Sequence, residues 1–184
     1  MTAKTTNIYQ FKITLEDIKP KIWRRIQVAE NYNFYELHLA IQNAMGWEDC
    51  HLHQFEMIDP QTGSKVIIGT TECNKLEEKT KIVHNFSLNN KTAAYEYDFG
   101  DSWRHEIILE KILPAETDVK YPACLGGQRA CPPEDCGGLP GYEYLLEIIN
   151  DPEHEEYEER MEWLGGEFDP EDFDPKLVEF KDHK

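Results

Sequence analysis

Basic residues are scarce in this sequence. It contains 19 lysines and arginines against 36 aspartates and glutamates, which gives a formal net charge of −17. Residues 151–184 hold 14 of the acids and 4 of the bases, so this segment alone carries a net charge of −10. Because such a surface repels phosphate backbones, we expect no affinity for naked nucleic acid unless a local basic patch supplies it.

The one candidate for such a patch is the stretch Lys19–Arg25, KPKIWRR. Charged side chains on a strand are ordinarily solvated or paired with opposite charges. We therefore expect Arg24 and Arg25 to decorate a strand and to pair with the acidic remainder. Association with nucleic acid through this patch is kept as the second alternative to the leading function given below.

Long apolar runs and a disulfide framework are also missing. No segment approaches about 18 consecutive apolar residues, and the N-terminal MTAKTTN lacks the apolar core of a signal peptide. We therefore expect no membrane association and a cytoplasmic location. The five cysteines are an odd number, which argues against a set of structural disulfides.

The motifs of several large enzyme classes are absent as well. The sequence contains no GxxxxGK[ST], no GxSxG and no HExxH. The GGLPG segment is not followed by a dinucleotide-binding βαβ pattern, so we interpret it as a turn. The leading expectation is a non-enzymatic binding or accessory module that acts through a protein or peptide partner, although no pattern decides whether the chain is an enzyme.

The order of periodic segments predicts an α+β fold. At 184 residues and 40% apolar content, the chain suits a single domain over residues 1–184, with a core of about 8–173 and an acidic helical part over 151–184. Alternating segments predict strands over 8–16, 22–28, 51–58 and 64–69, and a helical stripe after Asn33 predicts a helix. We expect a mixed or largely antiparallel sheet with helices on one face.

A central hairpin is predicted over Tyr95–Glu110, YEYDFGDSWRHEIILE. Two alternating runs flank Gly100-Asp101, where a glycine can supply the positive φ of a tight turn. A turn centred there would place Asp98 opposite Trp103 and Glu96 opposite His105, with Cβ atoms about 5 Å apart.

Two motifs, YDFGDSW over 97–103 and ACPPEDCGG over 130–138, stand out. Further motifs flank them at 21–25 (KIWRR), 45–47 (MGW), 51–55 (HLHQF) and 151–155 (DPEHE). In this order they resemble the plasmid pRiA4b ORF-3-like family, over roughly Ile8 to Phe173. The resemblance implies a compact α+β domain found in bacteria and archaea, on chromosomes and on mobile elements. It implies no established activity and no agreed catalytic residues.

Some relatives in that family carry a resolvase-like label from their gene neighbourhood. A serine recombinase would need a nucleophilic serine surrounded by arginines and a DNA-binding helix-turn-helix. This sequence shows neither, and its five arginines are scattered. We therefore do not expect recombinase chemistry.

The Pro/Gly/Cys-rich stretch 121–141, YPACLGGQRACPPEDCGGLPG, predicts an ordered loop over the central hairpin. Its prolines and glycines suit neither a helix nor a central strand, and loops of this length in compact domains are usually functional. Loop and hairpin together predict a polar pocket formed from His51, His53, Glu96, Asp98, Asp101, Trp103, His105, Glu134 and Asp135.

The histidines of this predicted pocket leave two interpretations open. His51 and His53 are two apart on a predicted strand, so both rings would share one face. Together with His105 and nearby carboxylates they could form a hard metal site or an acid–base pair, as in a metal-assisted hydrolase. Alternatively, they form a hydrogen-bonded cluster of buried, neutral histidines that fixes the hairpin against the sheet.

Three cysteines of the predicted loop also leave alternatives open. Cys124, Cys131 and Cys136 are separated by six and four residues, and only the second spacing falls within the range of zinc knuckles. With His105 or His53 as a fourth ligand they could hold Zn²⁺. Otherwise they are free thiols packed as small apolar residues, or Cys136 has a redox role.

Aromatic residues offer one further interpretation. Four tryptophans and nine tyrosines could line a ligand groove or a peptide-binding face, although core packing accounts for most such residues. An exposed Trp103 would favour binding.

Overall fold

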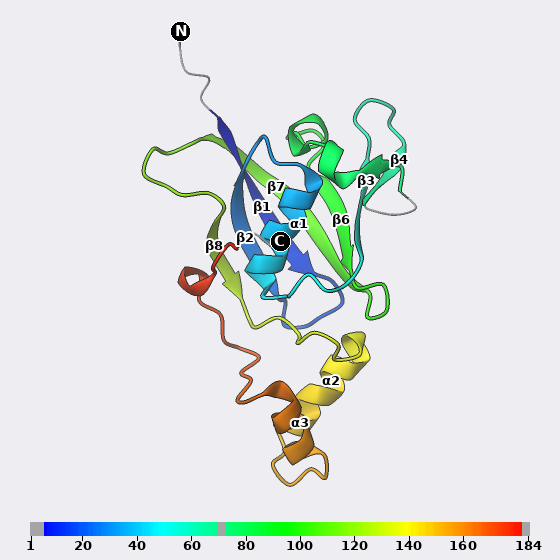
Figure 1. Ribbon diagram of the computed structural model, residues 1–184, viewed down its shortest axis with the longest axis vertical. Coiled ribbons are helices and arrows are strands. Elements are labelled where there is room, and N and C mark those ends of the chain that lie inside the picture. Colours follow the sequence, from blue (N-terminus) through cyan, green and yellow to red (C-terminus); the bar gives the residue numbers. More distant parts are fainter. Residues whose placement is uncertain (1–5, 70–72, 182–184) are drawn as a thin grey trace.

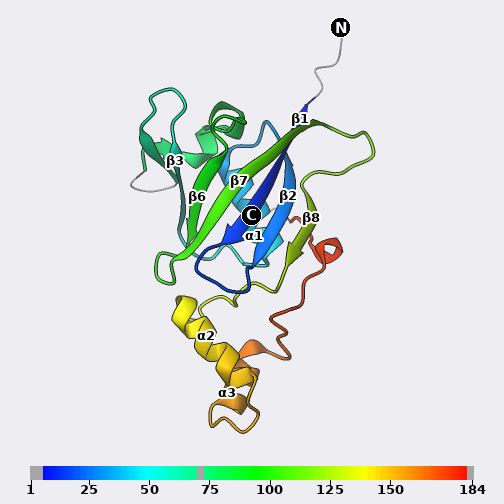
Figure 2. The same ribbon diagram turned by 180° about the vertical axis from the view of Figure 1, so that it is seen from behind.

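Eight strands form one open sheet in the order β5-β4-β3-β6-β7-β1-β2-β8 (Figures 1 and 2). The computed structural model describes residues 6–69 and 73–181. Every neighbouring pair of strands is antiparallel except β4 and β5. The predicted single α+β domain with a largely antiparallel sheet is confirmed. The elements are β1 Asn7–Leu15, β2 Trp23–Ala29, α1 Phe34–Met45, β3 His53–Ile58, β4 Lys65–Gly69, β5 Lys75–Leu76, β6 Thr92–Tyr97, β7 Trp103–Pro114, β8 Ala123–Gln128, α2 Gly138–Ile149 and α3 Tyr157–Leu164, with short 3₁₀ helices at Glu77–Lys79, Ile82–His84 and Pro175–Leu177.

Helix α1 lies across one face of this sheet (Figures 1 and 2). The side chain of Asn33 accepts from the backbone N–H of Glu36, and the side chain of Glu36 accepts from the backbone N–H of Asn33, which together form the predicted capping box. Gly46 ends the helix with a φ of 96°. The core between helix and sheet contains the buried stripe of α1 together with the predicted inward face of β1: Phe34, Leu37, Ile41, Met45, Tyr9, Phe11, Ile13 and Leu15.

The two arginines of β2 point to opposite faces of the sheet. Arg25 faces out, and its Nε and Nη2 donate to Glu110 at 2.7 and 2.9 Å, which confirms the predicted ion pair. Arg24 is only 1% exposed, because side chains two apart on a strand share a face and Ile22 and Ile26 face the core. The expectation that Arg24 decorates the surface is therefore wrong.

Helices α2 and α3 project beyond one end of the sheet and do not cover its face (Figure 1). Tyr142, Leu145 and Ile148 bury one side of α2, whereas α3 has no buried residue. Within the described residues of the acidic part 151–184, helix is confined to α3 and the 3₁₀ helix Pro175–Leu177. Among the residues that the structure describes, no helix is long and apolar enough to span a membrane.

The Pro/Gly/Cys-rich stretch divides into two parts. Its first part contains β8, which pairs with β2 at the edge of the sheet and lies far from the central hairpin. Glycine is tolerated on an edge strand, and at Gly127 it is required, because a side chain there would clash with Phe173 and with the backbone of Trp23. Only the second part returns to the hairpin, so the expected covering loop is confined to residues after about 130.

Candidate functional site

The tip of the central hairpin is a five-residue loop, Asp98–Ser102. Asp98 and Ser102 both have a φ of 55°, and the backbone N–H of Ser102 donates to the carbonyl of Asp98 at 2.6 Å. The Asp98 carboxylate also accepts from the backbone N–H of Gly100 at 2.9 Å. Asp98 therefore organises the turn, because aspartate tolerates left-handed backbone and hydrogen-bonds its own loop.

This tip shifts the predicted register by one residue. Tyr97 pairs with Trp103, and Glu96 pairs with Arg104. The predicted pairs Glu96–His105 and Asp98–Trp103 are wrong, because the turn is not the two-residue Gly100-Asp101 turn and Gly100 has no positive φ. As a consequence Glu96 lies off the pocket, where it accepts hydrogen bonds from Gln54 and Ser102.

Residues Pro132–Gly137, the PPED loop, pack against this hairpin tip. The indole N–H of Trp47 donates to the carbonyl of Pro132 at 3.0 Å. The hydroxyl of Tyr97 donates to Glu134 Oε1 at 2.9 Å, and the backbone N–H of Gly137 donates to Asp101 Oδ2 at 3.1 Å. The second part of the loop that was predicted to cover the hairpin is thus held on it by side chains of the YDFGDSW and ACPPEDCGG motifs.

The hairpin-tip pocket, defined by His51, Asp98, Glu134 and Asp135, forms where loop and hairpin meet. His51 Nε2 lies 3.6 Å from Asp98 Oδ2, 3.9 Å from Glu134 Oε2 and 3.1 Å from Asp135 Oδ1. The side chains of Asp98 and Glu134 are 11% and 17% exposed, whereas that of Asp135 is 72% exposed. One imidazole nitrogen therefore faces three carboxylates in a pocket that opens to solvent on the Asp135 side.

Two polar atoms in the pocket are buried and lack a hydrogen-bond partner. They are His51 Nε2 and Glu134 Oε2, which face each other. The other oxygen of Glu134 accepts from both Tyr97 and the backbone N–H of Glu48. Burial and this hydrogen bonding raise the pKa of Tyr97, so the phenol stays protonated and holds Glu134 in place.

The chain is similar to known proteins over most of its length. The family model of the plasmid pRiA4b ORF-3-like protein matches residues 7–177. The chain belongs to the plasmid pRiA4b ORF-3-like family. Uncharacterized protein y4hQ of Sinorhizobium fredii (strain NBRC 101917 / NGR234) is 34% identical over 178 residues, which cover 95% of this chain and 87% of that protein.

A crystal structure also resembles this pRiA4b ORF-3-like chain. It is that of MM3350, a protein of unknown function from Methanosarcina mazei Go1, which is 52% identical. The match covers 96% of this chain and 100% of that chain, with a TM-score of 0.90. MM3350 shares the fold of this chain, and the names of both relatives state no activity.

His53 lies outside the hairpin-tip pocket, in a separate buried cluster of this pRiA4b ORF-3-like domain. Strand β3 begins at His53, so His51 precedes the strand and the two rings do not form one site. His53 Nε2 lies 2.7 Å from Glu77 Oε2, and its ring stacks on that of His38 with centroids 3.4 Å apart. His38 in turn lies 2.7 Å from Asp49.

The sequence analysis missed this buried cluster, although part of it was detectable. His38 lies four residues after Phe34 and three before Ile41, on the apolar stripe of α1, so its position predicted burial. Glu77 lies in a short 3₁₀ helix without a periodic pattern. No local signal connected it to His53, 24 residues away.

Trp103 and His105 are buried in the core and do not line the pocket. Trp103 is 3% exposed, so the exposed Trp103 that would have favoured binding is not observed. His105 is fully buried, with Nδ1 3.3 Å from the carbonyl oxygen of Tyr95. Burial lowers the pKa of His105 to about 4, so this ring is neutral near pH 7.

In the described part of the chain, Cys124, Cys131 and Cys136 are not gathered into the zinc site that the sequence left open as an alternative. Three groups of histidine, cysteine or carboxylate atoms within 4.8 Å of one another occur in the described part of the chain, and none contains Cys124, Cys131 or Cys136. Cys124 belongs to β8, whereas Cys131 directly precedes the PPED loop and Cys136 lies within it. Burial raises the pKa of all three thiols, that of Cys136 to about 12, which disfavours thiolate chemistry.

Proposed function

We propose that the hairpin-tip pocket binds a divalent transition-metal ion through His51, Asp98 and Asp135, with Glu134 as a further ligand. The observation that carries this proposal is the pair of buried, unpartnered atoms, His51 Nε2 and Glu134 Oε2, that face each other among further carboxylates. A buried polar atom without a partner is destabilising unless something else satisfies it.

The separations of the polar atoms suit a metal ion. Ligand atoms about 2.1 Å from an ion lie about 3.4 Å apart in a tetrahedron. The three distances from His51 Nε2 to carboxylate oxygens are 3.6, 3.9 and 3.1 Å, which bracket that value. A set of one imidazole and carboxylates suits Zn²⁺, Mn²⁺ or Fe²⁺.

A hydrogen-bonded cluster accounts less well for the same residues. Even a protonated His51 could donate only one proton from Nε2, which leaves most of the surrounding carboxylate oxygens without a donor. Ligand atoms of Asp98, Asp135 and His51 all lie within 4.8 Å of one another, so the two carboxylates repel each other, and a divalent cation would offset this repulsion. The hydrogen bonds that hold Glu134 and the turn that holds Asp98 are the kind of outer support that metal ligands have.

The open side of the pocket bears on the alternative of a metal-assisted hydrolase. Because Asp135 is 72% exposed, an ion in the pocket would be accessible to a ligand from solvent. An open position is what distinguishes catalytic from structural sites. Of the functions that the sequence left open, this geometry therefore supports the metal-assisted one. It would use His51, whereas His53 and His105 lie outside the hairpin-tip pocket.

Nucleic-acid association loses support from the same structure. Arg24 is buried and Arg25 is paired with Glu110, so the KPKIWRR stretch presents only its two lysines freely. Two lysines on a chain of net charge −17 give only weak electrostatic attraction to a phosphate backbone.

The test is calorimetric titration of ZnCl₂ and MnCl₂ into protein that has been treated with EDTA and then freed of chelator. We expect one site per chain, with affinity reduced at least about 100-fold in His51→Ala and about tenfold in Tyr97→Phe, which loses the hydrogen bond to Glu134 and the one from the backbone N–H of Cys50. His84→Ala removes an exposed histidine and is the matched control. Equal binding by His51→Ala and the wild type would overturn the proposal.

A further inference from the structure

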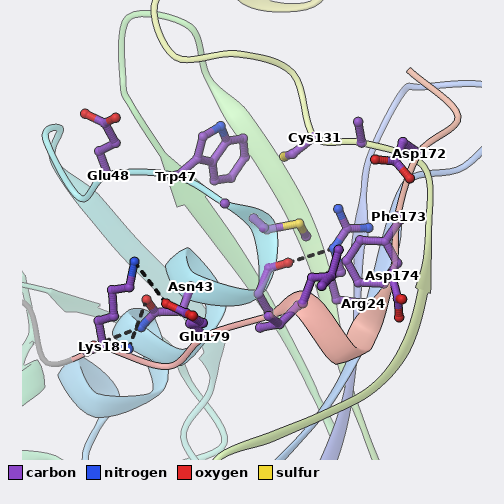
Figure 3. A pocket seen from close by; sticks show the side chains of 16 residues that line it. Arg24, Asn43, Trp47, Glu48, Cys131, Asp172, Phe173, Asp174, Glu179 and Lys181 are labelled. Carbon is purple, nitrogen blue, oxygen red and sulfur yellow. Dashed lines mark hydrogen bonds and ion pairs between the residues drawn. The ribbon is translucent and has the colours of Figure 1, made fainter. Parts of the chain in front are cut away.

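A groove of about 740 Å³ opens between the C-terminal end of α1 and the C-terminal segment 172–181 (Figure 3). Its volume lies in the range of ligand-binding clefts. None of the four residues of the hairpin-tip pocket lines it. The groove is therefore a second surface, whose occupancy can be tested independently of the cation site.

The floor of the groove is apolar, and its one buried charged side chain, Arg24, donates to backbone carbonyls. Met45 and Trp47 are each 4% exposed and line the groove together with Phe173. Arg24 donates to the carbonyls of Ala44 and Gln128 at 2.8 and 3.1 Å, and its guanidinium lies 3.7 Å from the centroid of the Phe173 ring. Nε and Nη1 of Arg24 are therefore occupied by backbone carbonyls, and the face of its guanidinium by the Phe173 ring.

The rim of the groove is acidic. Glu48, Asp172 and Asp174 are exposed, and no lysine or arginine within 6–69 and 73–181 forms an ion pair with any of them. Glu179 pairs with Lys181 at 3.3 Å and so contributes little net charge. In Figure 3, Glu48 lies on one side of the apolar floor and the two aspartates lie on the other.

The C-terminal wall of the groove is fixed to the body of the domain. Arg129 pairs with Glu171 at 2.6 Å, just before the wall begins. At its far end, Asn43 donates to the carbonyl of Lys181 at 3.1 Å and accepts from the backbone N–H of Lys181 at 3.3 Å. Because both ends are held, a ligand would enter a largely pre-formed site.

We infer that this groove binds a basic segment of a partner protein, with an apolar side chain on the floor and lysines or arginines against Glu48, Asp172 and Asp174. Charge complementarity selects this partner, since a free rim of carboxylates attracts cationic side chains and repels acidic ones. A second copy of the chain is disfavoured, because two molecules of net charge −17 repel each other.

The test uses fluorescence anisotropy with a labelled ten-residue peptide of alternating lysine and leucine, and a second peptide in which glutamate replaces lysine. All titrations contain EDTA, so that binding does not depend on the cation site. We expect the lysine peptide to bind more weakly as salt increases, and the glutamate peptide not to bind. Equal binding of both peptides, or binding of neither, would overturn the inference.

The variants locate the binding surface. The variant Glu48→Gln/Asp172→Asn/Asp174→Asn should lower affinity for the lysine peptide roughly tenfold. The matched control, Glu158→Gln/Glu159→Gln/Glu162→Gln, removes the same charge from exposed positions on α3. If the control loses as much affinity, the attraction is only that of an acidic protein, and the groove is not the site.

A charge reversal gives a second, positive readout. The variant Glu48→Lys/Asp172→Lys places bases on both sides of the floor, so it should bind the glutamate peptide that the wild type does not bind. Both substituted positions are exposed, which leaves the fold intact. Failure of this variant to gain binding, in folded protein, would contradict the proposed role of the rim.

Discussion

Two clusters of histidine and carboxylate lie close together in this chain, at His51 and at His53, and they differ in how their imidazole nitrogens are satisfied. In the buried cluster, His53 and His38 each have a carboxylate at 2.7 Å, and Tyr95 lies 2.8 Å from the second nitrogen of His38. In the hairpin-tip pocket, His51 Nε2 faces three carboxylates and makes no hydrogen bond.

The difference separates a structural cluster from a candidate site. A ring nitrogen with one close partner is satisfied, whereas one that faces several acceptors without a hydrogen bond is available to the proposed cation. Ring geometry supports the same division, because the His38 and His53 planes are 4° apart with centroids separated by 3.4 Å. An ion midway between them would lie about 1.7 Å out of each ring plane, away from the nitrogen lone pairs.

The largest expected effect comes from breaking the buried cluster. His53→Ala leaves the Glu77 carboxylate, which is 1% exposed, buried without its partner. We expect the free energy of unfolding to fall by about 3–5 kcal/mol, measured by urea denaturation. His51→Ala and the control His84→Ala should each change it by less than about 1 kcal/mol. Similar losses at positions 51 and 53 would remove the distinction between the two clusters.

The next effect is a loss of stability in acid caused by His105. Burial lowers its pKa from 6.5 to about 4, and the charge of Arg24 acts in the same direction. Since the unfolded chain binds the proton more readily, this contribution to stability is present above pH 6.5 and is lost as the pH falls towards 4. The loss amounts to about 3 kcal/mol.

The measurement is the free energy of unfolding at pH 7 and at pH 4 for the wild type and for His105→Gln. The loss in the free energy of unfolding between pH 7 and pH 4 should be smaller in His105→Gln than in the wild type, by up to about 3 kcal/mol. Burial also lowers the pKa of His38, so part of the acid loss remains in both proteins. An identical pH dependence in wild type and variant would show that His105 does not titrate as described.

A smaller effect distinguishes the residues of the hairpin tip. Asp98→Ala loses the hydrogen bond to Gly100 and places alanine at a φ of 55°, so we expect a loss of about 1–2 kcal/mol. Gly100→Ala should cost less than about 1 kcal/mol, because Gly100 has no positive φ and only the Asp98 side chain is near its Cβ position. Thermal unfolding of both variants checks the order, and a larger loss at Gly100 would favour the two-residue turn.

The smallest expected effect concerns a substitution in the hairpin-tip pocket itself. Asp135→Asn removes one of the converging carboxylates, and asparagine tolerates the φ of 56° at this position. In metal-free protein we expect a gain of a few tenths of a kcal/mol in the free energy of unfolding, because repulsion is relieved. Asp151→Asn, on the distant α2–α3 connection, is the control, and an equal gain there would mean that only net charge matters.

The fold was largely predictable because its strong signals are local. Alternation over β1 and the Asn33–Glu36 capping box both depend on residues adjacent in sequence. The register of the hairpin was not predictable, because it depends on the hydrogen bond from Asp98 to its own loop rather than on the Gly100-Asp101 pair. Strand β8 was missed because its glycines suit an edge position that only the assembled sheet reveals.

The candidate site was partly predictable for a related reason. The two acidic motifs at 97–103 and 130–138 were expected to meet beside the histidines of the HLHQF motif, and His51, Asp98, Glu134 and Asp135 do lie together. Glu96 was misplaced because a shift of one residue moves a side chain to the opposite face of a strand.

Crystals of EDTA-treated protein soaked in ZnCl₂ and measured at the zinc absorption edge test the cation site most directly. We expect one strong anomalous peak, about 2.1 Å from His51 Nε2 and in contact with carboxylate oxygens of Asp98 and Asp135. We expect no peak between His38 and His53. A map with its strongest peak at the stacked histidines or at the cysteines, or with none beside His51, would contradict the proposed cation site.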